Sequence, residues 1–161
     1  MTGNAVVKII LPDEAALERL AGAAAISMPA SPLVVYLEGD LGTGKTTFAR
    51  ALLRSLGEPG PVRSPTYGLM AEYTTPAGRV LHLDLYRNQD PAELSQLGLA
   101  DYVAGSRLWL IEWPERAAGR LPASDIRLRL EVDGPGRSVE IRPTSPAGRQ
   151  WAEAISAGRF S

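Results

Sequence analysis

The chain has 161 residues, 45% of them hydrophobic, and a formal net charge of −1. This length suits one domain, residues 1–161, with its own core, and the near-neutral charge argues against tight, independent binding of nucleic acid, which needs a basic surface. The absence of cysteine excludes thiol chemistry. No apolar run could span a bilayer and the N-terminus lacks a signal-peptide pattern, so we expect a cytoplasmic protein.

The first predicted elements are an edge strand over residues 5–11 and a helix that begins at residues 12–14. Proline suits the first helical turn, and acidic residues there interact favourably with the helix dipole. Leu17, Leu20 and Ala24 recur at helical spacing, so we expect them to face the core.

Residues 39–46 match the pattern G-x-x-x-x-G-K-[ST] of the phosphate-binding P-loop. The apolar run at residues 33–38 predicts a buried strand before this loop, and Phe48, Leu52 and Leu56 predict a helix after it. Strand, loop and helix form the context that the motif requires, which argues against a chance match. One of the chain's only two lysines also stands where the motif requires lysine.

The P-loop residues are predicted to bind the phosphates of ATP. Glycine permits positive φ and close approach, so that successive N–H groups and the helix N-terminus can surround an anion. Lys45 should pair with the β- and γ-phosphates, and the Thr46 hydroxyl should bind Mg²⁺. The predicted contact residues of this stretch are Gly39, Asp40, Leu41, Gly42, Thr43, Gly44, Lys45, Thr46 and Thr47.

Residues 58–66 contain three prolines and one glycine, which indicates an ordered loop rather than a helix. In many P-loop proteins this position holds the segment that senses the γ-phosphate. Ser64 and Thr66 offer hydroxyl groups for that role and Arg63 offers a charge. A plain connector is equally compatible with the sequence.

Two short strands, at residues 67–73 and 79–85, predict a β-hairpin and therefore a mixed sheet. His82 and Asp84 share one face of the second strand, and its three leucines share the other. His82 is the only histidine of the chain, and a lone strand histidine is more often structural than catalytic. Asp84 stands at the end of an apolar strand and is a stronger candidate for chemistry.

Residues 108–112 are four apolar residues followed by an acid, the Walker B pattern. Open α/β sheets bind ligands at the carboxyl ends of their strands, where Glu112 would lie. Its carboxylate could hold Mg²⁺ directly or through water, as P-loop proteins require. The alternative is a strand that ends in a surface glutamate.

The remaining elements are a helix that begins at residues 90–93, a second hairpin formed by residues 126–132 and 137–142, and a closing helix over residues 147–157. The arginine-bearing face of the second hairpin is most simply solvated, although it could meet a partner or a nucleotide edge. The apolar stripe of the closing helix is predicted to be Trp151, Ala154 and Ile155.

The chain has no lysine after the P-loop, so it lacks the N-K-x-D motif with which small GTPases recognise guanine, and ATP becomes the expected nucleotide. Two classes of protein remain. One is an ATPase that drives a partner, and the other is a small-metabolite P-loop kinase. A kinase usually needs a basic lid over its substrates, and no helical lid is evident after Glu112.

Four motifs together resemble the TsaE (YjeE) family. They are residues 39–48, 64–67, 82–87 and 111–115, which stand in that family's order and at about its spacing. The resemblance extends from about residue 11 to about residue 137. It and the strand pattern imply an α/β, P-loop NTPase-like three-layer fold with a mixed, mainly parallel central sheet and β-hairpins.

The resemblance also implies an activity and partners. Members of this family are bacterial ATPases of the pathway that makes threonylcarbamoyladenosine at position 37 of tRNAs reading codons that begin with A. They work with TsaD, which transfers the carbamoyl group, and with its scaffold partner TsaB. The chain would then meet tRNA only through that protein complex, and the implied ligands are ATP and Mg²⁺.

Individual residues acquire roles from the same resemblance. Lys45, Asp84 and Glu112 would be catalytic, with Asp84 orienting water or the metal shell, and Thr46 and Glu112 would ligate Mg²⁺. The nucleotide would also be approached by residues outside the P-loop, namely Thr66 of the switch-like segment, Trp113 beside the site, and Glu14 and Arg137 toward the adenosine end.

Overall fold

The structure is a computed structural model that describes residues 6–58, 70–86, 98–99, 102 and 105–158. Within these residues, seven strands form one sheet in the order β1-β7-β6-β2-β5-β4-β3. The strands are β1 (Val7–Leu11), β2 (Leu33–Glu38), β3 (Met70–Thr75), β4 (Gly78–Asp84), β5 (Ser106–Glu112), β6 (Ile126–Asp133) and β7 (Gly136–Pro143).

The middle of the sheet is parallel and both edges are antiparallel. β2 pairs in parallel with β6 on one side and β5 on the other, and β5 pairs in parallel with β4. The antiparallel edges come from the two predicted hairpins, β3–β4 and β6–β7, and from β1, which pairs with β7. The predicted mixed α/β class is therefore confirmed, and β1 is the edge strand expected near the N-terminus.

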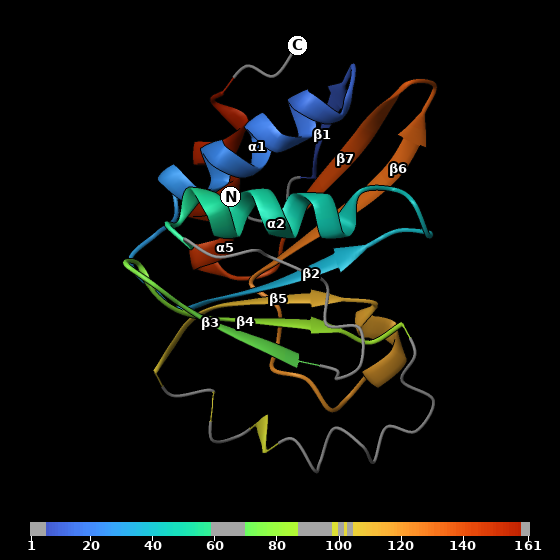
Figure 1. The fold of residues 1–161 in the computed structure, drawn as a ribbon. Coiled ribbons are helices and arrows are strands. Elements are labelled where there is room, and N and C mark those ends of the chain that lie inside the picture. Colours follow the sequence, from blue (N-terminus) through green and yellow to red (C-terminus); the bar gives the residue numbers. More distant parts are fainter. Residues whose placement is uncertain (1–5, 59–69, 87–97, 100–101, 103–104, 159–161) are drawn as a thin grey trace.

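In the described part of the chain, three helices cover one face of the sheet (Figure 1): α1 (Glu14–Ile26), α2 (Lys45–Ser55) and α5 (Pro146–Ser156). The first helical residue of α1 is Glu14, within the predicted range, and Asp13 caps the helix because its side chain accepts a hydrogen bond from the N–H of Ala16 at 2.8 Å. Pro12, which was expected in the first helical turn, lies before the helix. Among the described residues, no helix is long and apolar enough to cross a membrane.

A smaller apolar cluster forms the third layer on the opposite face. It contains the leucines of β4 that were predicted to share a face, and it is closed by the 3₁₀ helix η1 (Pro114–Ala117). Trp109 of β5 and the partly buried Tyr102 also belong to it. The two faces of β4 thus separate as expected, with Val80 in the larger cluster.

One predicted core residue is wrong. Ala154 is exposed on α5, whereas Ala152 is buried with Trp151 and Ile155. The reason is that α5 presents a different side to α1 and the sheet, and the Trp151 indole donates a hydrogen bond to the Ala24 carbonyl at 2.9 Å. The predicted helix start at residues 90–93 and the predicted loop residues 59–66 lie outside the described residues.

The sheet topology assembles the candidate site. β2, β4 and β5 are parallel, so their carboxyl ends lie at one edge of the sheet. In this register Asp84 pairs with Glu112, and Glu112 pairs with Leu37, close to the start of the P-loop. Residues from three distant parts of the chain therefore converge at one place.

Candidate functional site

The P-loop connects β2 to α2 and depends on glycine at three positions. Gly39, Gly42 and Gly44 have φ of 141°, 78° and 106°, values that favour glycine. Gly39 also lies against β6, since a Cβ there would be 2.4 Å from the Leu130 carbonyl oxygen. The second hairpin therefore supports the loop from behind.

Lys45 is buried at the start of α2, with its ammonium group inside the loop. Its Nζ donates hydrogen bonds to the carbonyl oxygens of Gly39 at 2.6 Å and Asp40 at 2.8 Å. Burial lowers the pKa of Lys45, and the neighbouring carboxylates, Glu112 first among them, partly oppose that shift. A buried cation of this kind is suited to an anionic ligand.

Trp113 covers this ammonium group. The centroid of an indole ring lies 4.3 Å from Lys45 Nζ, and the Tyr86 ring centroid lies 5.0 Å from that of Trp113. Trp113 has a φ of 58°, and it is the only non-glycine residue of positive φ in the described part of the chain. This left-handed conformation turns the chain out of β5 immediately after Glu112.

Glu112 and Thr46 form the polar pair expected of a metal site. The Thr46 hydroxyl lies 3.0 Å from Oε1 and 3.2 Å from Oε2 of Glu112. Glu112 is only 2% exposed, so the alternative of a surface glutamate is excluded. On its other side Glu112 contacts His82, whose Nε2 lies 2.6 Å from Oε2.

Asp84 lies at the end of β4, beside Glu112 on β5. Its Oδ1 accepts a hydrogen bond from the backbone N–H of Tyr86 at 3.1 Å, which orients the carboxylate. Asp84 is only partly buried and lines the same pocket as Glu112. It is therefore the more accessible of the two acids.

The opposite end of the site is formed by Glu14 at the start of α1 and Arg137 on β7. The Thr47 hydroxyl donates to Glu14 Oε1 at 3.4 Å. Arg137 donates from Nε to the Thr43 carbonyl at 3.0 Å and from Nη2 to the Gly42 carbonyl at 3.3 Å. Arg137 thus binds the P-loop itself as well as bordering the pocket.

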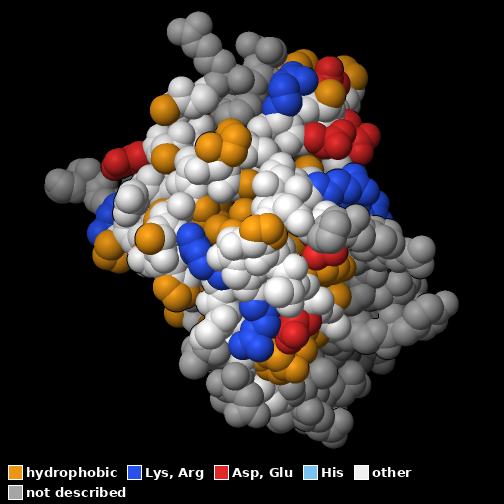
Figure 2. Space-filling view, turned by 60° about the vertical axis from the view of Figure 1, so that its left-hand side comes forward, with side chains coloured by type: hydrophobic (Ala, Val, Ile, Leu, Met, Phe, Trp, Pro, Cys, Tyr) orange, Lys and Arg blue, Asp and Glu red, His pale blue; other side chains and the backbone are white. Residues whose placement is uncertain are grey.

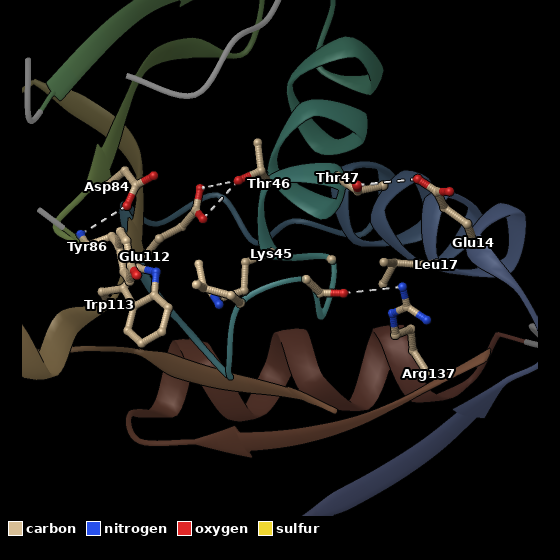
Figure 3. Close-up of a pocket in the computed structure, with 13 residues that line it drawn as sticks. Glu14, Leu17, Lys45, Thr46, Thr47, Asp84, Tyr86, Glu112, Trp113 and Arg137 are labelled. Carbon is tan, nitrogen blue, oxygen red and sulfur yellow. Dashed lines mark hydrogen bonds between the residues drawn. The ribbon is translucent and has the colours of Figure 1, made fainter. Parts of the chain in front are cut away.

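These groups surround a pocket of about 270 Å³ (Figure 3). Lys45 lies near its middle, between the acids and Trp113 at one end and Glu14 and Arg137 at the other. The lining residues are Glu14, Leu17, Leu41, Gly42, Gly44, Lys45, Thr46, Thr47, Asp84, Tyr86, Glu112, Trp113 and Arg137.

Most of the site residues expected from the sequence are brought together here. Gly39, Asp40 and Thr43 are not among the lining residues and act within the loop, where the Thr43 hydroxyl donates to the Asp40 carbonyl at 2.9 Å. Thr66 lies outside the described residues, as do Arg63 and Ser64. The roles assigned to all of these residues stay predictions.

Two lining residues were not predicted as site residues. Tyr86 was part of a quoted motif, residues 82–87, but no role was drawn from it. Leu17 was predicted only as a core residue, and it is both buried and adjacent to Gly44. An apolar helical stripe cannot reveal that one of its members also borders a pocket.

The donor set fits Mg²⁺ bound together with a nucleotide. The described residues include no group of three or more His, Cys, Asp and Glu side chains that could hold a metal. Thr46 and Glu112 offer a hydroxyl and a carboxylate, and Mg²⁺ typically takes few protein ligands alongside water and phosphate oxygens. Lys45 and the loop N–H groups suit the phosphates.

Comparisons with known proteins show which family the sequence resembles. A family model described as "Threonylcarbamoyl adenosine biosynthesis protein TsaE" matches residues 11–139. The chain is 40% identical over 124 residues to "tRNA threonylcarbamoyladenosine biosynthesis protein TsaE" of Haemophilus influenzae, covering 77% of this chain and 78% of that one. It is 36% identical over 148 residues to the protein of that name in Nostoc, covering 89% and 90%.

A solved structure shows the same fold. The crystal structure of Bacillus subtilis YdiB superposes with a TM-score of 0.75 and covers 98% of each chain, at 24% sequence identity. At that identity the likeness supports the three-layer architecture and the order of elements, and nothing more specific.

Proposed function

The chain belongs to the TsaE family, and from that premise we propose that it is an Mg²⁺-dependent ATPase of tRNA threonylcarbamoyladenosine biosynthesis, acting in the cytoplasm. The observation that carries the proposal is the convergence of three groups in one pocket. These are the P-loop Lys45, the Thr46–Glu112 pair and the nearby Asp84. Together they provide the positive charge, metal ligands and acid that phosphoryl chemistry uses.

Binding of the phosphates is assigned to the P-loop and to Lys45. The loop N–H groups and the start of α2 offer hydrogen bonds and the positive end of a helix dipole. Lys45 offers a full charge, held at the loop by the Gly39 and Asp40 carbonyls. Thr46 and Glu112 would hold Mg²⁺, which supplies positive charge to neutralise phosphate oxygens.

Hydrolysis further requires an oriented water, and we assign that role to Asp84. Its carboxylate lies at the pocket edge and is oriented by the Tyr86 N–H. Glu112, by contrast, is buried and engaged by Thr46 and His82. We therefore propose different roles for the two acids: Glu112 binds the metal, and Asp84 orients the attacking water.

We expect slow hydrolysis by the isolated chain, because the arginine in its pocket already donates its hydrogen bonds to backbone carbonyls. Among the described arginines only Arg137 lines the pocket, and Nε, Nη1 and Nη2 each donate to a backbone carbonyl. An arginine supplied in trans can accelerate phosphoryl transfer by about 10³–10⁵-fold. We propose that the TsaD–TsaB complex stimulates this ATPase.

One face of the molecule and the net charge support recruitment of tRNA through such a complex rather than directly. On the face shown in Figure 2, the described Lys and Arg side chains form small separate groups, some with acidic side chains beside them. The net charge of −1 points the same way. Tight binding of a polyanion would need several clustered cations.

Steady-state phosphate release, with and without TsaD–TsaB, tests the proposal. We expect slow release by the chain alone, at least severalfold faster release with the pair, and little release by Glu112→Gln in either condition. Equal rates with and without the pair, together with tight tRNA binding by the chain alone, would contradict it. That result would favour the alternative of a small-metabolite P-loop kinase, whose ATP turnover would instead rise on addition of its acceptor.

A further inference from the structure

A buried histidine–glutamate pair lies directly behind the candidate Mg²⁺ ligands. His82 Nε2 is 2.6 Å from Glu112 Oε2, and the two residues are 0% and 2% exposed. The proposed function uses Glu112 but leaves His82 without a role. A buried polar pair at a functional site needs its own physical explanation.

The contact is diagonal across two parallel strands. His82 pairs in register with Leu110, whereas Glu112 pairs with Asp84. The Glu112 carboxylate nevertheless reaches His82, on the same face as α2, and Thr46 reaches it from the start of that helix. The carboxylate is therefore held from two sides, by one residue of β4 and one of α2.

The hydrogen-bonding pattern assigns the proton on the His82 ring. Its Nδ1 is buried and has no hydrogen-bond partner among the residues that the structure describes. A buried N–H without an acceptor is costly, so the ring proton belongs on Nε2, where it is donated to Glu112. An ionised, buried carboxylate needs such donors to offset its lost hydration.

We infer that His82 is a positioning residue for Mg²⁺, an inference that rests on the proposed function. His82 contacts only Oε2 of Glu112, and it thereby fixes the carboxylate with Oε1 as the oxygen nearer to the Thr46 hydroxyl, at 3.0 Å against 3.2 Å for Oε2. The cation would be held on that side. Hydrogen bonds to metal ligands commonly orient them in this way, and their loss typically costs about 10- to 100-fold in metal affinity.

A merely structural histidine would behave differently. If His82 only filled space in the core, its replacement would alter the stability of the protein and the binding of nucleotide whether or not Mg²⁺ was present. If it positions Glu112, its replacement should alter the Mg²⁺-dependent part of nucleotide binding selectively. The two roles can therefore be separated by titration.

Three variants separate the donor from the volume of the side chain. His82→Gln retains an N–H donor at about the reach of Nε2, and His82→Asn ends at about the position of Nδ1. His82→Leu has no donor. Each is titrated with the non-hydrolysable analogue AMP-PNP in EDTA, and then with Mg²⁺ at fixed AMP-PNP, by calorimetry, after thermal unfolding shows that it is folded.

We expect the Mg²⁺ concentration for half-saturation to rise about 10- to 100-fold in His82→Leu and His82→Asn, and much less in His82→Gln. Affinity for AMP-PNP in EDTA should stay within about twofold of wild type, since the phosphate-binding loop is unchanged. Wild-type Mg²⁺ dependence in a folded His82→Leu or His82→Asn variant would overturn the inference. So would an equal loss of AMP-PNP affinity with and without Mg²⁺.

The same titration distinguishes failure of the proposed function. A wild-type chain that binds no AMP-PNP, or whose binding is indifferent to Mg²⁺, contradicts the Mg²⁺-ATP assignment itself. A wild-type chain that responds to Mg²⁺, beside a His82→Asn variant that responds equally, contradicts only the positioning role. If Leu and Asn both fail to fold, a His82→Gln variant with lost Mg²⁺ dependence overturns the role of the donor, and one with retained dependence supports it.

Discussion

The Thr46 hydroxyl lies 3.0 Å from Oε1 of Glu112, although 66 residues separate the two in the chain. Thr46 stands in the first turn of α2, and Glu112 is the last residue of β5. They meet because β2, which leads into the P-loop, pairs in parallel with β5. The pair that we propose to bind the metal is thus a direct product of strand order.

Nucleotide choice is the first prediction. The chain lacks the lysine that an N-K-x-D guanine motif would need, so ATP and ADP should bind more tightly than GTP. Competition titration against a fluorescent adenine nucleotide measures the order of affinities. Tighter binding of GTP than of ATP would contradict the assignment.

Lys45→Ala should weaken ATP binding while the fold survives. The substitution removes a cation that would pair with phosphates, and charge-assisted hydrogen bonds of this kind are worth about 1.5–3 kcal/mol, or about 10- to 150-fold in affinity. Calorimetry with ATP and circular dichroism measure the two properties.

The matched control is Lys8→Ala, which removes the only other lysine, an exposed residue of β1. It should bind ATP like wild type. A folded Lys45→Ala protein with wild-type affinity and turnover would show that this loop is not the site.

Substitutions of the two acids should impair different properties of the protein. Glu112→Gln keeps the shape of the side chain but removes the charge that a hard cation prefers, so the Mg²⁺ dependence of nucleotide binding should weaken. Asp84→Asn should lower the rate of hydrolysis more than it lowers affinity, because a water-orienting group acts mainly in the transition state. Single-turnover hydrolysis beside equilibrium binding separates the effects. If both variants lost affinity alone, the assigned division would be wrong.

Arg137→Ala should destabilise the nucleotide-free protein as well as weaken nucleotide binding. Arg137 donates a partly buried hydrogen bond to the Thr43 carbonyl and an exposed one to the Gly42 carbonyl. A hydrogen bond from a charged donor is worth about 1.5 kcal/mol or more, so its loss should be measurable. Urea unfolding without nucleotide and AMP-PNP titration measure the two effects.

Arg142→Ala is the control for that variant, since Arg142 lies on the same strand, is exposed, and is 3.9 Å from Glu140. A surface pair of this kind contributes about 0–1 kcal/mol, so little change is expected. If Arg137→Ala weakened nucleotide binding and left the free energy of unfolding unchanged, Arg137 would act on the adenosine end alone, as the family resemblance implies.

The sequence by itself determined the local parts of this protein. Short periodic patterns and turn signals predict each of these parts: the P-loop, the buried strand before it, the helix after it and both hairpins. The position of Glu112 at the end of an apolar strand could also be predicted from a local pattern. The faces of β4 could also be assigned, since side chains alternate along a strand.

Only the tertiary structure decided which of these parts meet. The contact of His82 with Glu112 depends on the parallel register of β4 and β5, and the contact of Arg137 with the P-loop carbonyls depends on β6 lying beside β2. A register shift of one residue would turn His82 to the opposite face of the sheet. Strand order and register are set by packing between segments tens of residues apart. A local sequence pattern therefore cannot predict them.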